Sequence, residues 1–272
     1  MASGIPYTVS VVEGAMIDFN ALAFLQPAKV LPPSDVGSYL DLGLRWIHLL
    51  AGITWIGLLY FFNLVNVGFM KKLDAPTKGK VIPALLPSAL WWFRWGAMVT
   101  VLAGFIYWAL FLHREPQPPD GTPGQYLWRT LGIWLVVVVV AWFINYFLLR
   151  IPVVTKNGWW VALFVTLLAA GIFYLNTWFN TYDGISNRVA SIAVGGGYGV
   201  FMLLNVWGII WPAQKRIIAW TKENAEQGTA IPAESAALAR RAFLASRANT
   251  WLSLPMLFFM AVASHFPMFT GG

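Results

Sequence analysis

The chain has only three histidines, and their side chains are the ones best suited to chemistry. His48 lies about two turns into an apolar stretch, His113 ends a second stretch, and His265 lies near the end of the last one. Imidazole nitrogens ligate metals, and two histidines at similar depth on different helices can ligate haem iron from opposite faces. We therefore take His48 and His265 as a candidate metal-ligating pair.

The residues around His48 suit a flat cofactor. Gly52 and Trp55 follow His48 at spacings that place all three on one helix face. A small residue beside a histidine leaves room for a macrocycle, and Ala261 stands in the same relation to His265. Arg45, one turn before His48, is placed to pair with a haem propionate. These residues predict a haem site at one end of the protein.

Each of these features also has an ordinary structural interpretation. Small residues in membrane helices commonly serve close helix packing, and His113, beside Arg114, is expected to be a solvated interfacial residue. Asparagines within apolar stretches are expected to hydrogen-bond to neighbouring helices. These are Asn63, Asn66, Asn145, Asn176 and Asn205. The glycine-dense segment at positions 195–199 is expected to pack against a helix or a flat cofactor, and it lacks the context of a phosphate-binding loop.

Several kinds of chemistry are excluded or disfavoured by residue types. The sequence has no cysteine, which excludes thiolate metal sites, iron–sulfur clusters and covalent haem attachment. Carboxylates are essentially absent from the apolar stretches, which argues against a proton-coupled transporter. Neither a nucleophile with a partner base nor an acid pair is evident in the sequence.

The elements that position these residues must be membrane helices. Of the 272 residues, 58% are hydrophobic and 11% are charged, whereas a soluble domain carries roughly 25% charged residues. The 16 tryptophans also suit a protein with two membrane interfaces. In lipid, apolar stretches of about 20 residues form helices, because unpaired backbone groups are costly there. The net charge of +7 then reports membrane orientation rather than nucleic-acid binding.

We predict an all-α polytopic membrane bundle of about six transmembrane helices, formed by residues 41–272. The expected spans are Leu42–Met70, Trp92–Leu112, Trp128–Leu149, Trp159–Trp178, Ala190–Trp211 and Asn249–Phe266. Residues 1–40 are expected to form a periplasmic or interfacial segment, within which Val11–Leu25 could form a short helix.

The segments between the spans are expected to form connections of different lengths. Asp74–Lys80 is expected to be a short basic connection, and Gln214–Arg247 a long, partly helical one. Pro212 is expected to end the fifth span, and Pro255 to kink the sixth.

Basic residues predict the orientation. With six spans, both termini lie on one side, and only a minority of the 18 lysines and arginines fall there: Lys29, Arg45, Arg114, Arg129 and Arg188. Basic residues are retained in the cytoplasm. We therefore expect both termini in the periplasm and the chain in a bacterial inner membrane.

Four segments resemble a known family. The stretch LRWIHLLAGITWIG (Leu44–Gly57) resembles the opening helix of the membrane domain of PuuD-type bacterial urate oxidases, the urate oxidase N-terminal domain family. WWFRW (Trp91–Trp95), NVWGIIWPAQKR (Asn205–Arg216) and SRANTWLSLPMLFFMAVASHFP (Ser246–Pro267) resemble later segments of that domain in the same order. The resemblance implies a polytopic domain that carries haem, with His48 and His265 matching family histidines.

The sequence also departs from that family. The family has a histidine early in the fifth helix where Ala193 stands here, and an acidic residue in the second helix where Gly96 stands. Its C-terminal cytochrome c domain is lacking in this sequence, which has no cysteine. These departures point away from urate oxidation itself and towards a subunit of a larger membrane assembly.

Three functions follow as hypotheses. The leading one is a membrane-embedded b-type haem subunit that transfers electrons near the periplasmic face, with His48 and His265 as axial ligands and a periplasmic cytochrome or quinol as partner. A narrower version is an oxidase acting on urate or a related purine. The alternative is a cofactor-free accessory or scaffold subunit that packs against other membrane proteins, which the loss at Ala193 favours.

Overall fold

The computed structural model describes residues 33, 35–115, 123–180 and 185–269. Contacts divide the chain into two units, Met1–Tyr39 and Leu40–Gly272. The first unit contributes few described residues, which lead into the first helix, and the expected helix at Val11–Leu25 lies outside the described part. The location of residues 1–40 therefore stays a prediction.

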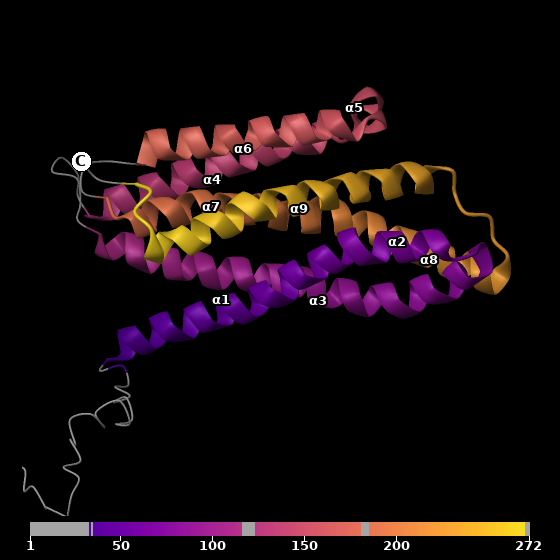
Figure 1. The fold of residues 1–272 in the computed structure, drawn as a ribbon, viewed down its shortest axis with the longest axis horizontal. Coiled ribbons are helices and arrows are strands. Elements are labelled where there is room, and N and C mark those ends of the chain that lie inside the picture. Colours follow the sequence, from indigo (N-terminus) through magenta and orange to yellow (C-terminus); the bar gives the residue numbers. More distant parts are fainter. Residues whose placement is uncertain (1–32, 34, 116–122, 181–184, 270–272) are drawn as a thin grey trace, which may run out of the picture. The chain divides into compact units, whose positions relative to one another are not determined.

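Within the described ranges every element is a helix, which confirms the all-α fold (Figure 1). The α-helices are α1 (Val36–Tyr60), α2 (Val67–Lys72), α3 (Ala75–Arg114), α4 (Pro123–Leu148), α5 (Pro152–Lys156), α6 (Gly158–Asn180), α7 (Asn187–Asn205), α8 (Trp211–Gln227) and α9 (Glu234–His265). Two π-helical turns, η2 (Phe61–Asn66) and η3 (Val206–Ile210), join α1 to α2 and α7 to α8.

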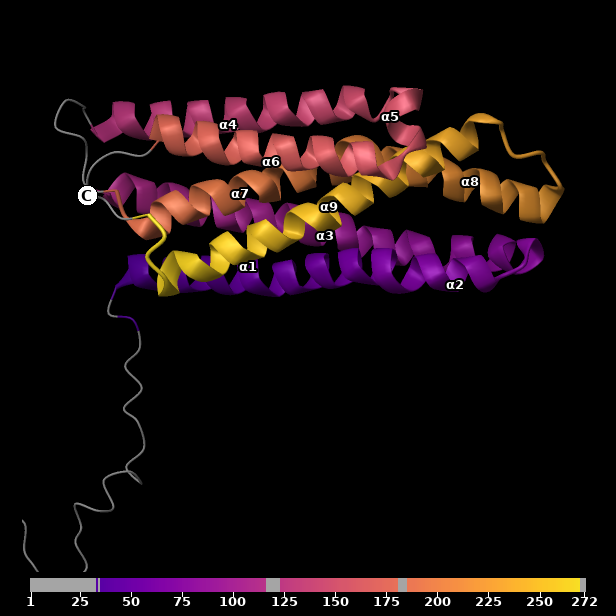
Figure 2. The ribbon, with the colours of Figure 1, turned by 45° about the horizontal axis from the view of Figure 1, so that its top comes forward.

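Five of the six expected spans coincide with helices that are long and apolar enough to cross a membrane. Among the described residues these are Val36–Lys72, Ala75–Arg114, Leu127–Leu148, Gly158–Asn180 and Asn187–Gln227. The sixth expected span lies in α9, which has 32 residues but is not among the five. Polar residues such as Asn249 and Ser253 lower the hydropathy of α9, although it runs along the bundle beside α7 (Figure 2).

Several helix boundaries differ from expectation, because hydropathy shows which residues can lie in lipid and not where a helix begins or ends. Asp74–Lys80 is not a connection, since α3 begins at Ala75 and is capped by Asp74 Oδ1, which accepts a hydrogen bond of 2.8 Å from the Thr77 amide. The segment Gln214–Arg247 is mostly helical, and α8 is capped at its C-terminal end by Gly228, whose φ of 70° suits glycine. Its partly helical character is confirmed.

Pro212 does not end the fifth helix, which continues through η3 into α8. A proline ring normally clashes with the carbonyl four residues earlier, here that of Gly208. The π-helical turn widens the helix just before Pro212, and we take this wider turn as the reason that the chain stays helical. Pro255 likewise lies inside α9.

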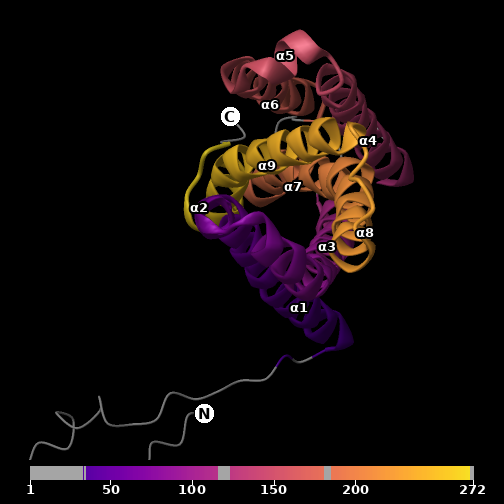
Figure 3. The same ribbon diagram turned by 90° about the vertical axis from the view of Figure 1, so that its right-hand side faces the viewer.

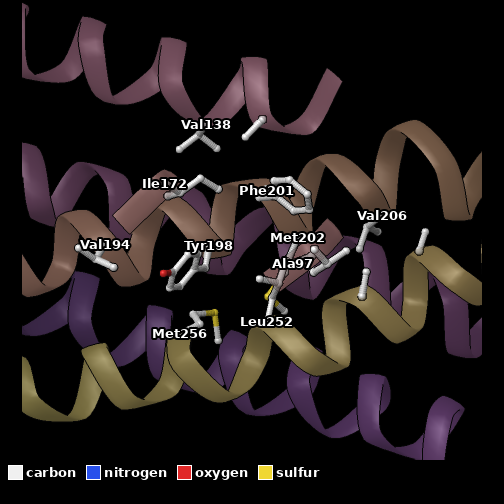
Figure 4. Packing of buried hydrophobic residues seen from close by; sticks show 14 of the residues in the cluster. Ala97, Val138, Ile172, Val194, Tyr198, Phe201, Met202, Val206, Leu252 and Met256 are labelled. Atoms are coloured by element: carbon white, nitrogen blue, oxygen red, sulfur yellow. The ribbon is translucent and has the colours of Figure 1, made fainter. Parts of the chain in front are cut away.

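Viewed along the helices, the second unit has three layers, with α7 and α9 between α1 and α3 on one side and α4 and α6 on the other (Figure 3). The middle helix α7 is the most buried, and Figure 4 shows Tyr198, Phe201 and Met202 packing among side chains of its neighbours. Gly195 allows α7 to lie close to α9, because a Cβ at this position would lie 3.1 Å from Phe259 Cβ and 3.2 Å from the Met256 carbonyl oxygen. The expected close packing of the glycine-dense segment is thus confirmed.

Asparagines join the layers. Asn205 lies at the centre: its Nδ2 donates to Asn249 Oδ1 at 2.8 Å, and its Oδ1 accepts from Asn145 Nδ2 at 3.0 Å. Asn63 Nδ2 donates to Ser246 Oγ at 2.8 Å. The expected bonds between helices are confirmed at these positions. They are not found for Asn176, whose side-chain atoms are buried without a partner among the described residues.

Candidate functional site

The main cavity in the described part of the second unit has a volume of about 740 Å³. Its walls come from α1, α3, α7 and α9, with Trp134 added from α4. This volume lies within the roughly 300–1,000 Å³ that small-molecule and cofactor sites occupy. The cavity is therefore large enough for an organic cofactor, and most of its wall is apolar.

Four of the predicted site residues meet at this cavity. Arg45, His48, Gly52 and Trp55 all line it from α1. Trp55 is only 1% exposed, and its Nε1 is buried without a hydrogen-bond partner in the described ranges. A buried indole N–H is a donor that a bound molecule could satisfy.

His48 is held in one orientation by α3. Its Nδ1 donates to the Thr100 carbonyl oxygen at 2.8 Å. Because a carbonyl oxygen only accepts, this bond fixes the proton of the neutral ring on Nδ1 and leaves the lone pair on Nε2. Nε2 makes no hydrogen bond within the described part of the chain. Metal-ligating histidines are typically oriented by this kind of bond from their other ring nitrogen.

Gly104 makes room for the His48 ring. A Cβ at position 104 would lie 2.6 Å from His48 Nδ1 and 2.7 Å from Cε1, so any larger residue would displace the imidazole. Gly104 itself lines the cavity. Sequence reasoning missed this residue, because a single glycine in an apolar helix carries no signal of the side chain that packs on it from another helix.

His265 is placed differently from His48. It is the last residue of α9, it is exposed, and it is not among the residues that line the cavity. The same helix supplies Met256 and Met260 to the cavity wall instead. The structure thus gathers His48 with two thioethers and leaves His265 at the end of the bundle. His113 is exposed at the end of α3, as expected for a solvated residue.

The two positions that depart from the family pattern lie outside the cavity wall. Ala193 is 5% exposed, and its carbonyl oxygen accepts a 2.7 Å hydrogen bond from Trp134 Nε1. At Gly96, a Cβ would lie 3.4 Å from the Ala51 carbonyl oxygen of α1. Position 96 therefore lies in van der Waals contact with α1, where α3 packs against it.

The cavity opens toward the outside of the bundle. Leu49 and Ile53 on α1 and Leu257 on α9 line it and are 59%, 62% and 42% exposed. In a membrane these apolar side chains face hydrocarbon. Among the described residues, no group of three or more His, Cys, Asp or Glu is placed to hold a metal ion.

The sequence model of a family described as "Urate oxidase N-terminal" matches residues 73–272. No curated protein and no solved structure matches the chain. The matched segment includes Gly104, Arg188, both cavity methionines and His265. It begins after α2, so the role of His48 rests on the geometry of the cavity.

Proposed function

The chain belongs to the urate oxidase N-terminal family, and on that premise we propose that it is a membrane-embedded b-type haem subunit that transfers electrons near the periplasmic face. One observation carries the proposal. His48 Nδ1 is bound to the Thr100 carbonyl oxygen in the wall of a large apolar cavity, and its Nε2 is left without a partner among the described residues.

The residues present fit haem b. The cavity offers an oriented imidazole at His48 and apolar walls on several helices. It is also lined by glycines at positions 52, 104, 196 and 199, which have no side chains to fill the space that a flat ring needs. Bound haem would supply one-electron chemistry, whose potential the axial ligands and the surrounding polarity set. The protein's part is to hold the ring, exclude water and fix the protonation of His48.

The ligand opposite His48 has two candidate sources. His265 matches a family histidine, but its imidazole is exposed and would have to turn inward from the end of α9. Met256 and Met260 already line the cavity, and a His/Met pair raises the potential of haem relative to a His/His pair. The spectrum and the potential separate these two ligand sets.

An absorption spectrum tests the proposal. Protein purified in mild detergent from cells well supplied with haem should show a Soret band, sharp bands on reduction with dithionite, and about one haem b per chain by pyridine haemochrome. A folded protein without a Soret band would contradict the proposal. It would support the alternative of a cofactor-free accessory subunit, which the buried Ala193 at the position of a family histidine favours. Membrane subunits that co-purify with the protein would then be sought.

The orientation is also a proposal. The end of the bundle that holds the start of α3, α8 and the start of α9 carries most of the basic residues, and the basic side of a membrane protein is cytoplasmic (Figure 1). Both termini would then be periplasmic, and His48 would lie near the face where a periplasmic cytochrome or a quinol would act as partner. Alkaline phosphatase fused to the C-terminus should be active, and a fused fluorescent protein that matures only in the cytoplasm should stay dark.

Oxidation of urate or a related purine is a narrower form of the same proposal. The family name supports it. Loss of the urate absorbance band in the presence of an electron acceptor would test it, with haem-free protein as the control.

A further inference from the structure

Two arginines line the cavity from different helices. Arg45 lies on α1, three residues before His48, and Arg188 lies in the first turn of α7. Sequence reasoning used Arg188 only as a charge that reports orientation. The fold brings this side chain to the same cavity as Arg45, although 142 positions separate them in the sequence.

Neither guanidinium group has a carboxylate partner in the described part of the chain. Arg45 lies 5.9 Å from the centroid of the Tyr107 ring, and Arg188 lies 4.8 Å from that of Phe111. The Arg188 guanidinium also makes a long 3.5 Å contact with Ser264 Oγ. These contacts orient the guanidinium groups without neutralising their charge.

The neighbouring carboxylates at this end of the bundle are already engaged. Asp41 forms an ion pair with Arg114. Glu115 accepts hydrogen bonds from the Ser186 amide at 3.1 Å and the Ser186 hydroxyl at 2.5 Å. Two cations therefore line a mostly apolar cavity, and neither Asp41 nor Glu115 forms an ion pair with them.

Guanidinium groups bind carboxylates through paired, charge-assisted hydrogen bonds. We propose that Arg45 and Arg188 bind the two carboxylates of a flat apolar ligand, one from each wall of the cavity. This inference rests on the proposed function, under which the carboxylates are the two haem propionates. Arg188 lies where α7 begins, so the two arginines would hold the carboxylates at that end of the cavity, and His48 follows Arg45 by about one helical turn of α1.

A comparison of two porphyrins tests this arrangement. Haem-free protein is titrated with haem b and with haem b dimethyl ester, whose propionates carry no charge. Arg188→Gln and Arg45→Gln should each weaken haem b binding at least about tenfold and leave the affinity for the diester unchanged. Each substitution should also lower the reduction potential of bound haem b, because a positive charge near the propionates is removed.

Two variants serve as controls. Arg129→Gln removes an exposed arginine from α4 at the same end of the bundle, which does not line the cavity, and it should leave both affinities unchanged. Arg188→Lys keeps the charge and should recover part of the haem b affinity. Circular dichroism and gel filtration of each variant show whether a loss of binding reflects misfolding.

The outcomes separate this inference from the proposed function. If the unsubstituted protein binds haem b and its diester equally, or if Arg188→Gln weakens both alike, the arginines do not bind the propionates and the inference falls alone. If arginine dependence appears only when anionic phospholipid is added, the arginines bind a lipid headgroup instead. If neither porphyrin binds the unsubstituted protein, the proposed function falls together with the inference.

Discussion

Gly104 and His48 are so close that a methyl group at position 104 would lie 2.6 Å from His48 Nδ1. Gly104→Ala should therefore push the imidazole off the Thr100 carbonyl oxygen and misplace Nε2. We expect a protein that still folds, because the ring can move, but whose haem spectrum is altered or lost. The measurement is the haem content and the reduced spectrum.

Gly132→Ala is the matched control for this change. Nothing lies within 4 Å of the Cβ that it adds in α4. Alanine is favoured over glycine in a helix by about 1 kcal/mol, so the control should keep the spectrum and equal or exceed the parent stability. Equal spectra for both variants would show that the packing of Gly104 on His48 does not govern the site.

If His48 ligates haem as proposed, His48→Ala should lower the haem content or change the reduced spectrum. Imidazole added to the variant should restore part of that spectrum, because the free ligand occupies the vacated position. An unchanged spectrum and haem content in His48→Ala would exclude His48 as a ligand.

Substitutions in α9 identify the second ligand. If His265 serves, His265→Ala should convert the haem to a five-coordinate species, and the potential of the parent protein should be low. If a methionine serves, Met256→Leu or Met260→Leu should do so instead, and the parent potential should be high. A spectrum that none of the three changes alters would place the second ligand elsewhere.

Asn205 and Asn176 are both 2% exposed or less, yet they should respond differently to leucine. Asn205→Leu leaves Asn145, Asn249 and Trp142 without their partner and should lower the free energy of unfolding by roughly 2 kcal/mol. Asn176→Leu removes an amide with no partner among the described residues, so its cost should be near zero. Thermal unfolding in one detergent compares them. An equal loss for Asn176→Leu would reveal a buried water or another partner.

The cap of α3 should be sensitive to acid. Hydrogen bonds from the side chain and amide of Thr77 hold the pKa of the Asp74 carboxyl below its ordinary value. A lowered pKa in the folded state means that the cap stabilises the helix start above the ordinary pKa and is lost as the pH falls through the lowered one. Amide exchange over residues 75–80, corrected for intrinsic rates, should then rise in acid. Asp74→Asn, which caps without titrating, should show no such rise.

The sequence predicts the lipid-facing part of this fold well and its helix ends poorly. Apolar stretches locate the five helices that are suited to span a membrane, since lipid selects for such stretches. Residues 75–91 of α3 lie outside the expected span, because a helix that leaves the lipid keeps its hydrogen bonds while its composition changes. The prediction that Pro212 ends the fifth helix failed because the π-helical turn η3 precedes it, which the sequence does not indicate.

The site could be predicted only in part. Arg45, His48, Gly52 and Trp55 were identified because one helix face carries them, and helical spacing alone reveals such a face. Gly104 and Arg188 come from other helices, and their relation to His48 depends on how the helices pack. The pairing of His48 with His265 stays a prediction, since similar depth does not say whether two side chains face the same space.

Of the helices in the described ranges, the cavity is walled by the earliest, α1, and the latest, α9, together with α3 and α7. A ribosome therefore delivers His48 early and the wall that carries Met256 and Met260 last. A nascent or truncated chain that stops before α9 has the imidazole but no enclosed site. Under the proposed function, a chain that stops short of α9 would therefore be unable to hold its cofactor.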